Sequence, residues 1–144
     1  MKQNKKRLTL ILSMLLITVM AFCLTGCNSK KETASTETTV YEDGAVIGEG
    51  SKTFEFTIVN TEGKEITLEI HTDKDTVRDA LLENNLIAGE DGEYGLYVKT
   101  VNGETVDYDT DGKYWAFYID GEYAMTGVDS TDVVDGSTYK FAAE

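Results

Sequence analysis

Apolar and polar residues alternate along two stretches in the first half of the chain. Phe54, Phe56 and Ile58 alternate with polar residues, and the same pattern recurs over residues 66–70. A period of two residues is typical of a strand with one buried face. Residues 60–64 contain a glycine and predict the turn that joins the two strands.

The apolar period then changes to that of a helix. Val77, Ala80 and Leu81 lie on one helical stripe. Asp73 or Asp75 can cap the start of the helix, and Gly89 lies where the helix would end. The pattern predicts one helix over residues 75–86.

The remaining sequence predicts a run of strands joined by tight turns. Asn102–Gly103 and Asp120–Gly121 are strong signals for two-residue hairpins, because both turn residues need a positive φ. Two strands, one helix and then several strands indicate an α+β fold, with one helix packed across a β-grasp-like mixed sheet. The later strands are expected over residues 94–101, 105–108, 113–119, 122–125 and 137–142.

The first 26 residues have the layout of a secretory signal, with a basic start, an apolar run and then small residues. Leu24–Thr25–Gly26–Cys27 resembles the lipobox of bacterial lipoproteins, in which the cysteine sulfur is lipidated and becomes residue one after cleavage. Two acyl chains suffice for stable attachment. A plain signal peptide or a single spanning helix are the alternatives, but a span needs about 20 apolar residues. The resemblance implies that lipid on Cys27 anchors the protein to the extracellular face of the cell membrane.

Composition divides the chain after the signal into a tether and one domain. Residues 27–51 are rich in Thr, Ser, Glu and Gly and poor in apolar residues, which predicts a flexible tether. Residues 52–144 form the expected domain. After residue 26 the chain carries nine basic and 26 acidic residues, a net charge of −17. This charge disfavours nucleic acid and anionic lipid headgroups, and it favours metal ions, cationic ligands or simply solubility.

An acidic loop is the candidate metal site. Asp107, Asp109 and Asp111, followed by Gly112, match the first half of a calcium-binding EF-hand loop. The twelfth position of that loop falls on Tyr118 rather than on glutamate. The alternative is an acidic hairpin loop that binds no ion.

Tyrosines form the candidate ligand-binding surface. Alternation over residues 114–119 places Trp115 and Phe117 in the core, whereas Tyr114 and Tyr118 face outward, where Tyr97 can join them. Exposed tyrosines offer apolar area with a polar tip and suit flat or sugar-like ligands. They also occur as cross-strand packing pairs.

The sequence predicts no catalytic activity. His71 is the only histidine, and neither cysteine leaves a free thiol once the signal is removed and Cys27 is lipidated. No serine therefore has a clear base partner, and no nucleophilic thiol is present in the mature domain.

Four segments of the chain form a recognisable set: Val-Arg-Asp-Ala-Leu at 77–81, Tyr-Trp-Ala-Phe-Tyr-Ile-Asp-Gly at 114–121, Gly-Val at 127–128 and Asp-Gly-Ser-Thr-Tyr at 135–139. Together they resemble the transcobalamin-like C-terminal domain, a family widespread among lipoproteins and surface proteins of Gram-positive bacteria. The resemblance covers about residues 52–143 and implies a β-grasp-type fold shared with the cobalamin carriers transcobalamin and intrinsic factor. In those carriers the turn after the Tyr-Trp strand contacts one face of the corrinoid. The resemblance implies that Tyr123, Ala124, Met125 and Thr126 make this contact here, although Met125 also suits a core position.

Three functions follow as expectations. The first is a surface module that binds a small molecule such as cobalamin, with no helical domain in this sequence to enclose it, and presents it to a transporter. The second is a structural or adhesive domain that contacts a protein or glycan through its tyrosines. The third is a cation-binding domain that uses the three aspartates of the acidic loop.

Lipidation of Cys27 can be tested directly. Cells fed labelled palmitate are expected to label the wild-type protein, because the thiol is the acylated group. Cys27→Ser is expected to remove the label and release the protein from the membrane fraction. Cys23→Ser is the matched control, since Cys23 is expected to leave with the signal. Equal membrane attachment of the Cys27→Ser variant would contradict the anchor.

Overall fold

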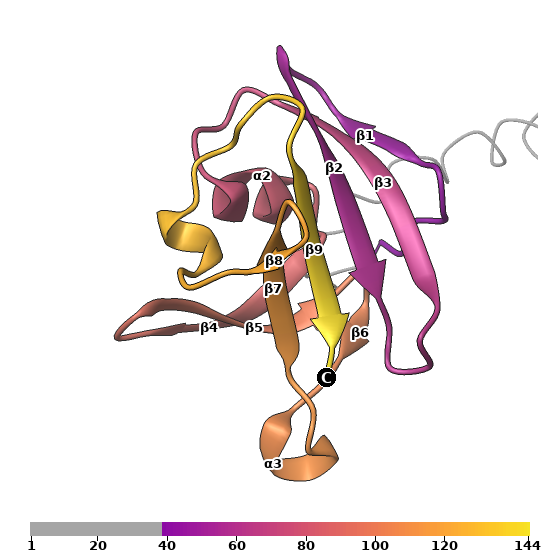
Figure 1. Ribbon diagram of the computed structural model, residues 1–144, viewed down its shortest axis with the longest axis vertical. Helices are drawn as coiled ribbons and strands as arrows, with labels where there is room; N and C mark the ends of the chain where they lie inside the picture. The colour runs from indigo at the N-terminus through magenta and orange to yellow at the C-terminus, as the bar shows by residue number, and fades with distance from the viewer. Residues whose placement is uncertain (1–38) are drawn as a thin grey trace, which may run out of the picture. The chain divides into compact units, whose positions relative to one another are not determined.

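The computed structural model describes residues 39–144 (Figure 1). Cys27, the signal segment and most of the expected tether lie outside the described residues. The elements in chain order are β1 (Val46–Gly48), β2 (Lys52–Val59), β3 (Glu65–Thr72), α2 (Val77–Glu83), β4 (Ile87–Gly92), β5 (Gly95–Val101), β6 (Glu104–Thr105), α3 (Tyr108–Asp111), β7 (Trp115–Ile119), β8 (Glu122–Tyr123), the 3-10 helix η1 (Val128–Ser130) and β9 (Thr138–Ala143).

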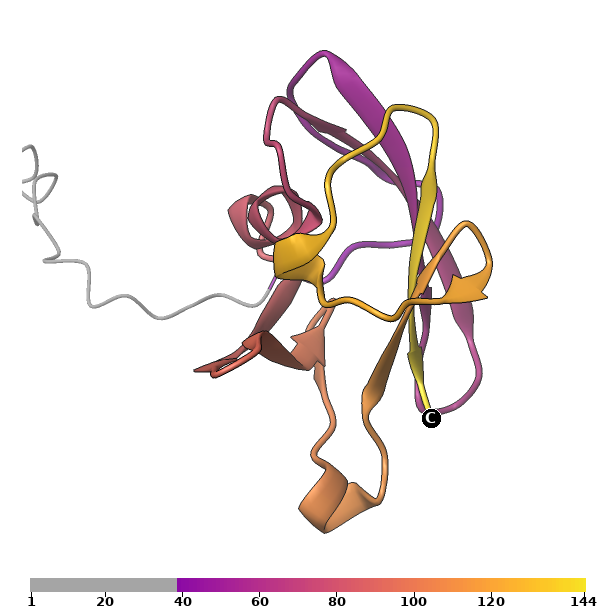
Figure 2. The same ribbon diagram turned by 60° about the vertical axis from the view of Figure 1, so that its left-hand side comes forward.

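The strands form two sheets. A six-stranded sheet has the order β1-β3-β2-β9-β7-β8, and a three-stranded sheet has the order β4-β5-β6. The larger sheet is mixed, because β1 runs parallel to β3 and β2 runs parallel to β9. Helix α2, η1 and the smaller sheet lie on one side of it (Figure 2). The α+β prediction of a mixed sheet with a packed helix is confirmed, but the later strands divide between two sheets.

Aromatic residues hold the centre of the larger sheet. Phe54 on β2 meets Tyr139 on β9 edge to face, with ring centroids 5.1 Å apart. Phe117 on β7 packs against Phe141 on β9 at 5.0 Å. All four side chains are at least 92% buried. These contacts keep β9 between β2 and β7 and so fix the place of the β7–β8 hairpin.

The folded domain begins before residue 52. Strand β1 pairs with β3 inside the stretch expected to be tether, and Ile47 is 7% exposed. The Gly44 amide donates to the Thr67 carbonyl at 2.8 Å. The edge of β3 offers backbone groups that need partners, and a short strand with one buried residue suffices to pair with them. A single buried residue leaves no periodic signal, so the tether boundary at residue 51 is corrected toward the N-terminus.

The helix is shorter than expected and is capped by a different residue. Thr76 is the N-cap, and its hydroxyl accepts from the Asp79 amide at 3.2 Å. Asn85 has φ 54° just after the helix, which stops it before residue 86. Strand β4 follows at once and was not predicted, since Ile87 is its only buried residue.

The two Asn-Gly and Asp-Gly hairpins are confirmed. Asn102 and Gly103 have φ values of 46° and 83° and join β5 to β6. Asp120 and Gly121 have φ values of 48° and 86° and join β7 to β8. The strand predicted over residues 105–108 ends early, because the acidic loop forms the helical turn α3.

Within residues 39–144, no helix combines the length and apolar character that crossing a bilayer requires.

Tyr139 gives a test of the aromatic core. Its buried hydroxyl donates to the Asp132 carbonyl at 2.8 Å and accepts from the Val134 amide at 3.0 Å. Tyr139→Phe keeps the ring but leaves both backbone groups without that partner, so we expect the free energy of unfolding in urea to fall by about 1–3 kcal/mol. Tyr94→Phe is the control, because Tyr94 is 93% exposed. Equal losses in the two variants would contradict the role of the hydroxyl.

Candidate functional site

The β7–β8 hairpin carries most of the residues expected to bind a ligand. Alternation along β7 turns Trp115 and Phe117 into the core and leaves Tyr118 on the opposite face, where it is half-buried. Tyr118 pairs across the hairpin with Tyr123. The tight Asp120–Gly121 turn therefore sets the two tyrosines side by side.

Tyr114, Tyr118 and Tyr123 form what we call the hairpin patch. The rings of Tyr118 and Tyr123 meet edge to face, with centroids 5.6 Å apart and an interplanar angle of 85°. The ammonium of Lys140 on β9 lies 4.4 Å from the centroid of the Tyr118 ring. Because this cation covers one ring face of Tyr118, the more exposed ring of Tyr123 is the better ligand contact.

The hydroxyls of the hairpin patch interact with neighbouring polar groups. The Tyr118 hydroxyl donates to Glu144 Oε1 at 2.6 Å, and this bond raises the pKa of Tyr118 to about 12. The neighbouring Tyr123 hydroxyl raises the pKa of Tyr114. The structure thus brings these three predicted residues together as one polar-edged aromatic surface.

The segment after β8 extends the hairpin patch with apolar area. The Ala124 amide donates to the Phe117 carbonyl at 2.9 Å, which holds the segment against β7. Met125 is 92% exposed, so it does not fill the core. A shallow depression of about 450 Å³ lies here, lined by Ile119, Asp120, Glu122, Tyr123, Ala124 and Met125. Thr126 lies next, with its hydroxyl 3.4 Å from that of Thr131.

Tyr97 does not join the hairpin patch. It lies on β5 in the smaller sheet, with Lys99 Nζ 5.9 Å from its ring centroid. Tyr97 lines a small cavity of about 130 Å³ together with Trp115 and Phe117, which point to the opposite side of β7 from Tyr118. The alternation of side chains along a strand could not show that Tyr97 lies apart from the hairpin patch, because Tyr97 belongs to a different sheet.

The acidic loop uses its carboxylates within its own turn. Asp107 is the N-cap of α3 and accepts from the Asp109 amide at 3.0 Å, while Asp111 Oδ2 accepts from the Asp107 amide at 2.8 Å. Lys99 Nζ lies 3.2 Å from Asp107 Oδ2, and this bond lowers the pKa of Asp107 and raises that of Lys99. In the part of the chain that the structure describes, no three His, Cys, Asp or Glu side chains are grouped to hold a metal ion.

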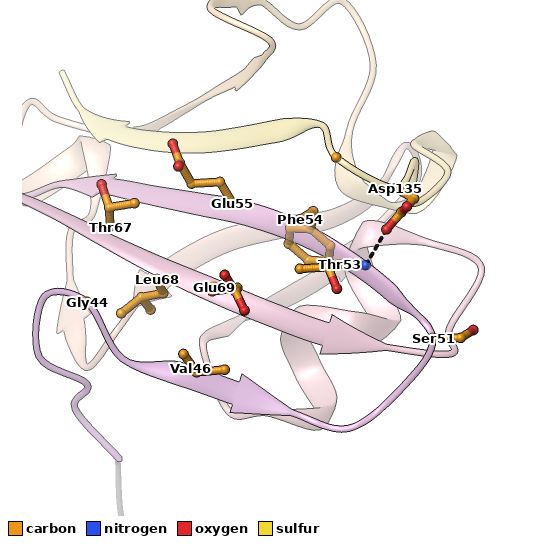
Figure 3. Close-up of a pocket in the computed structure, with 11 residues that line it drawn as sticks. Gly44, Val46, Ser51, Thr53, Phe54, Glu55, Thr67, Leu68, Glu69 and Asp135 are labelled. Carbon is orange, nitrogen blue, oxygen red and sulfur yellow. Dashed lines mark hydrogen bonds between the residues drawn. The ribbon is translucent and has the colours of Figure 1, made fainter.

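A depression of about 650 Å³, which the residue pattern did not reveal, lies on the exposed face of β1, β3 and β2 (Figure 3). Glu55 and Glu69 lie directly opposite each other there on β2 and β3. Asp135 Oδ1 accepts from the Thr53 amide at 2.7 Å at one end of it. Both glutamates occupy the polar positions of the predicted strands, but only the register shows that they face each other.

Comparison with protein families gives a match over residues 74–143 to a domain of unknown function, DUF4430. A crystal structure of a proposed metal-binding protein from Ruminococcus gnavus ATCC 29149 is 33% identical, with a TM-score of 0.62. The alignment covers 65% of this chain and 97% of that one. The chain belongs to the DUF4430 family. No curated protein matches it.

The DUF4430 domain is also similar in structure to haptocorrin, solved in complex with Cbi. The TM-score is 0.49 and the identity 17%, and the match covers 68% of this chain and 26% of haptocorrin. The β7–β8 hairpin and the segment after it lie wholly within the residues matched to DUF4430.

The link between Tyr118 and Glu144 can be tested by pH titration of the DUF4430 domain. The neutral hydroxyl makes the bond, so its stabilising effect is fully present below pH 10, the ordinary pKa, and is lost as pH rises through about 12. Glu144→Gln is expected to lower the pKa of Tyr118 toward 10, measured by tyrosinate absorbance with Tyr118→Phe to assign the signal. Glu122→Gln, on the same hairpin, is the control. An unchanged titration in Glu144→Gln would exclude the link.

Proposed function

We propose that this protein is a non-catalytic module that binds a small ligand on the outer face of the cell membrane, where lipid on Cys27 anchors it. The ligand surface is the hairpin patch together with Ala124, Met125 and Thr126. The observation that carries the proposal is the exposure of adjacent apolar side chains on a well-paired hairpin. Met125 is 92% exposed and Tyr123 is 53% exposed, beside a depression of about 450 Å³.

This surface suits a broad, flat ligand with an apolar face and a polar rim. Met125 is a soft contact that adapts to the shape of a ligand, and the Tyr123 ring supplies a rigid aromatic one. Polar groups surround them, including Thr126, Glu122 and the hydroxyl of Tyr114. A corrinoid has this form, a wide macrocycle edged with amides, and the family resemblance makes cobalamin the first ligand to test.

The open shape of the site predicts modest affinity for the module alone. Small-molecule pockets usually bury 70–90% of a ligand or more. The hairpin surface is a shallow depression that contacts a ligand from one side. A transporter or another surface protein would supply the opposite face, so the module would present its ligand rather than store it.

The adhesive alternative uses the same tyrosines. Tyrosine is enriched at protein interfaces because it combines area with a hydrogen-bonding tip. A protein or glycan partner would contact Tyr114 and Tyr123 without any need for the depression beside Met125. Binding experiments with small ligands therefore separate the two functions.

Calorimetry with cyanocobalamin and with cobinamide tests the ligand-binding function. Tyr123→Ala and Met125→Ala are each expected to weaken binding about 5- to 30-fold, as expected for loss of about 1–2 kcal/mol per contact. The matched control is Tyr94→Ala, since Tyr94 is as exposed as Met125 but lies in the β4–β5 turn.

Each of the other outcomes of these titrations would indicate a different site or a different function. Corrinoid binding that neither variant weakens would place the site away from the hairpin. Heat with calcium alone, abolished by Asp109→Ala, would favour the cation-binding function of the acidic loop. No heat with corrinoids or calcium would leave the adhesive function, to be tested with cell-wall glycans.

A further inference from the structure

The side chain of Asn102 binds both backbone groups of a residue far away in the sequence. The Tyr41 amide donates to Asn102 Oδ1 at 2.8 Å, and Asn102 Nδ2 donates to the Tyr41 carbonyl at 3.0 Å. Asn102 is 6% exposed, and its own amide donates to the Leu86 carbonyl at 2.7 Å. A side chain needs a donor and an acceptor on one planar group for this pairing, as an amide has. We call residues 40–42, which this pairing holds, the N-terminal strap.

A second contact closes the N-terminal strap. The Tyr41 hydroxyl donates to the Asn84 carbonyl at 3.1 Å, just after helix α2. Beyond the strap, the Gly44 amide and the Asp43 carboxylate bind the backbone of Thr67, so the chain is held independently from residue 43 onward. Release of Tyr41 would therefore free residues 40–42 and leave β1 in place.

Asn102 is also the one asparagine in the sequence that precedes a glycine. Without a side chain on Gly103, its backbone nitrogen meets little steric hindrance when it approaches the side-chain carbonyl carbon of Asn102. That attack forms a new C–N bond and a five-membered succinimide, and the bond from the same carbon to Nδ2 breaks with loss of ammonia. Water then opens the ring at either carbonyl, which yields aspartate or isoaspartate.

We propose that Asn102–Gly103 is a spontaneous deamidation site whose conversion releases the N-terminal strap. In the closed state two hydrogen bonds hold the amide plane of Asn102 against Tyr41 and restrain the rotation that the attack needs. Opening of the strap frees the side chain and permits the reaction. The product has a carboxylate in place of the amide, so it cannot donate to the Tyr41 carbonyl and repels it. The strap then cannot close again as before, and residues 40–42 join the expected tether.

The first experiment asks whether the strap controls the reaction. The full-length protein is incubated at pH 8.5 and 37 °C, and peptide mapping by mass spectrometry follows the 1 Da gain and the isoaspartate at residue 102. Tyr41→Ala is expected to deamidate several-fold faster than wild type, because it removes the bond to Asn84. Tyr94→Ala is expected to match wild type. Equal rates in Tyr41→Ala and wild type, or no conversion at residue 102 in either, would overturn the proposal.

The second experiment asks whether conversion releases the strap. Deamidated wild-type protein is separated by anion exchange, so no variant has to fold. Amide hydrogen exchange is expected to be faster at residues 40–42 and unchanged in β7 and β9. Asn102→Asp should behave in the same way. Unchanged protection of residues 40–42 in the deamidated protein would refute the release.

Asn60→Asp is the matched control for the added charge. Asn60 Oδ1 accepts from the amides of Glu62 and Lys64, a role that a carboxylate can also fill. The variant adds the same negative charge at another turn and keeps the acceptor through which Asn60 acts there, whereas Asn102→Asp loses the donor that binds the Tyr41 carbonyl. Hydrogen exchange at residues 40–42 should stay as in wild type, and a rise equal to that of Asn102→Asp would show a general charge effect and overturn the specific role of Asn102.

Discussion

The packing of β9 between β2 and β7 is the constraint on which the rest of the domain depends. Strand β9 comes last in the chain, yet it runs parallel to β2 and antiparallel to β7 at the centre of the larger sheet. The rings of Phe54, Tyr139, Phe117 and Phe141 interlock there. Aromatic side chains bury large areas, and edge-to-face pairs add about 0.5–1.5 kcal/mol each beyond that burial. Loss of this packing would separate the β2–β3 hairpin from the β7–β8 hairpin.

The candidate site depends on this packing through the pleat of β7. Successive side chains of a strand point to opposite faces, so the burial of Phe117 forces Tyr118 outward. Lys140 on β9 is aligned with Tyr118 by the same sheet register and covers one face of its ring. The site is therefore an open surface rather than a deep pocket. The sheet beneath it fixes the positions of its side chains.

The negative charge of the domain affects which ligands it can bind more than it stabilises the fold. Residues 39–144 hold seven basic and 24 acidic residues, a net charge of −17. Arg78 bonds to Asp129 at 2.8 Å and to Asp91 at 2.7 Å, and so ties α2 to η1 and β4. Exposed ion pairs such as Arg78–Asp91 contribute at most about 1 kcal/mol each, so the acidic excess is mainly a property of the exterior. It favours ligands that are neutral or cationic.

Local patterns were enough to predict the α+β class, the helix, both two-residue hairpins and the outward face of Tyr114 and Tyr118. Those features depend on periodicity and on turn residues, which act over a few positions. The separation of Tyr97 from the hairpin patch, the pairing of β1 with β3, and the hold of Asn102 on Tyr41 depend on contacts between residues distant in the chain. Such contacts form only when segments distant in the sequence pack together, and no local pattern of residues encodes which segments meet.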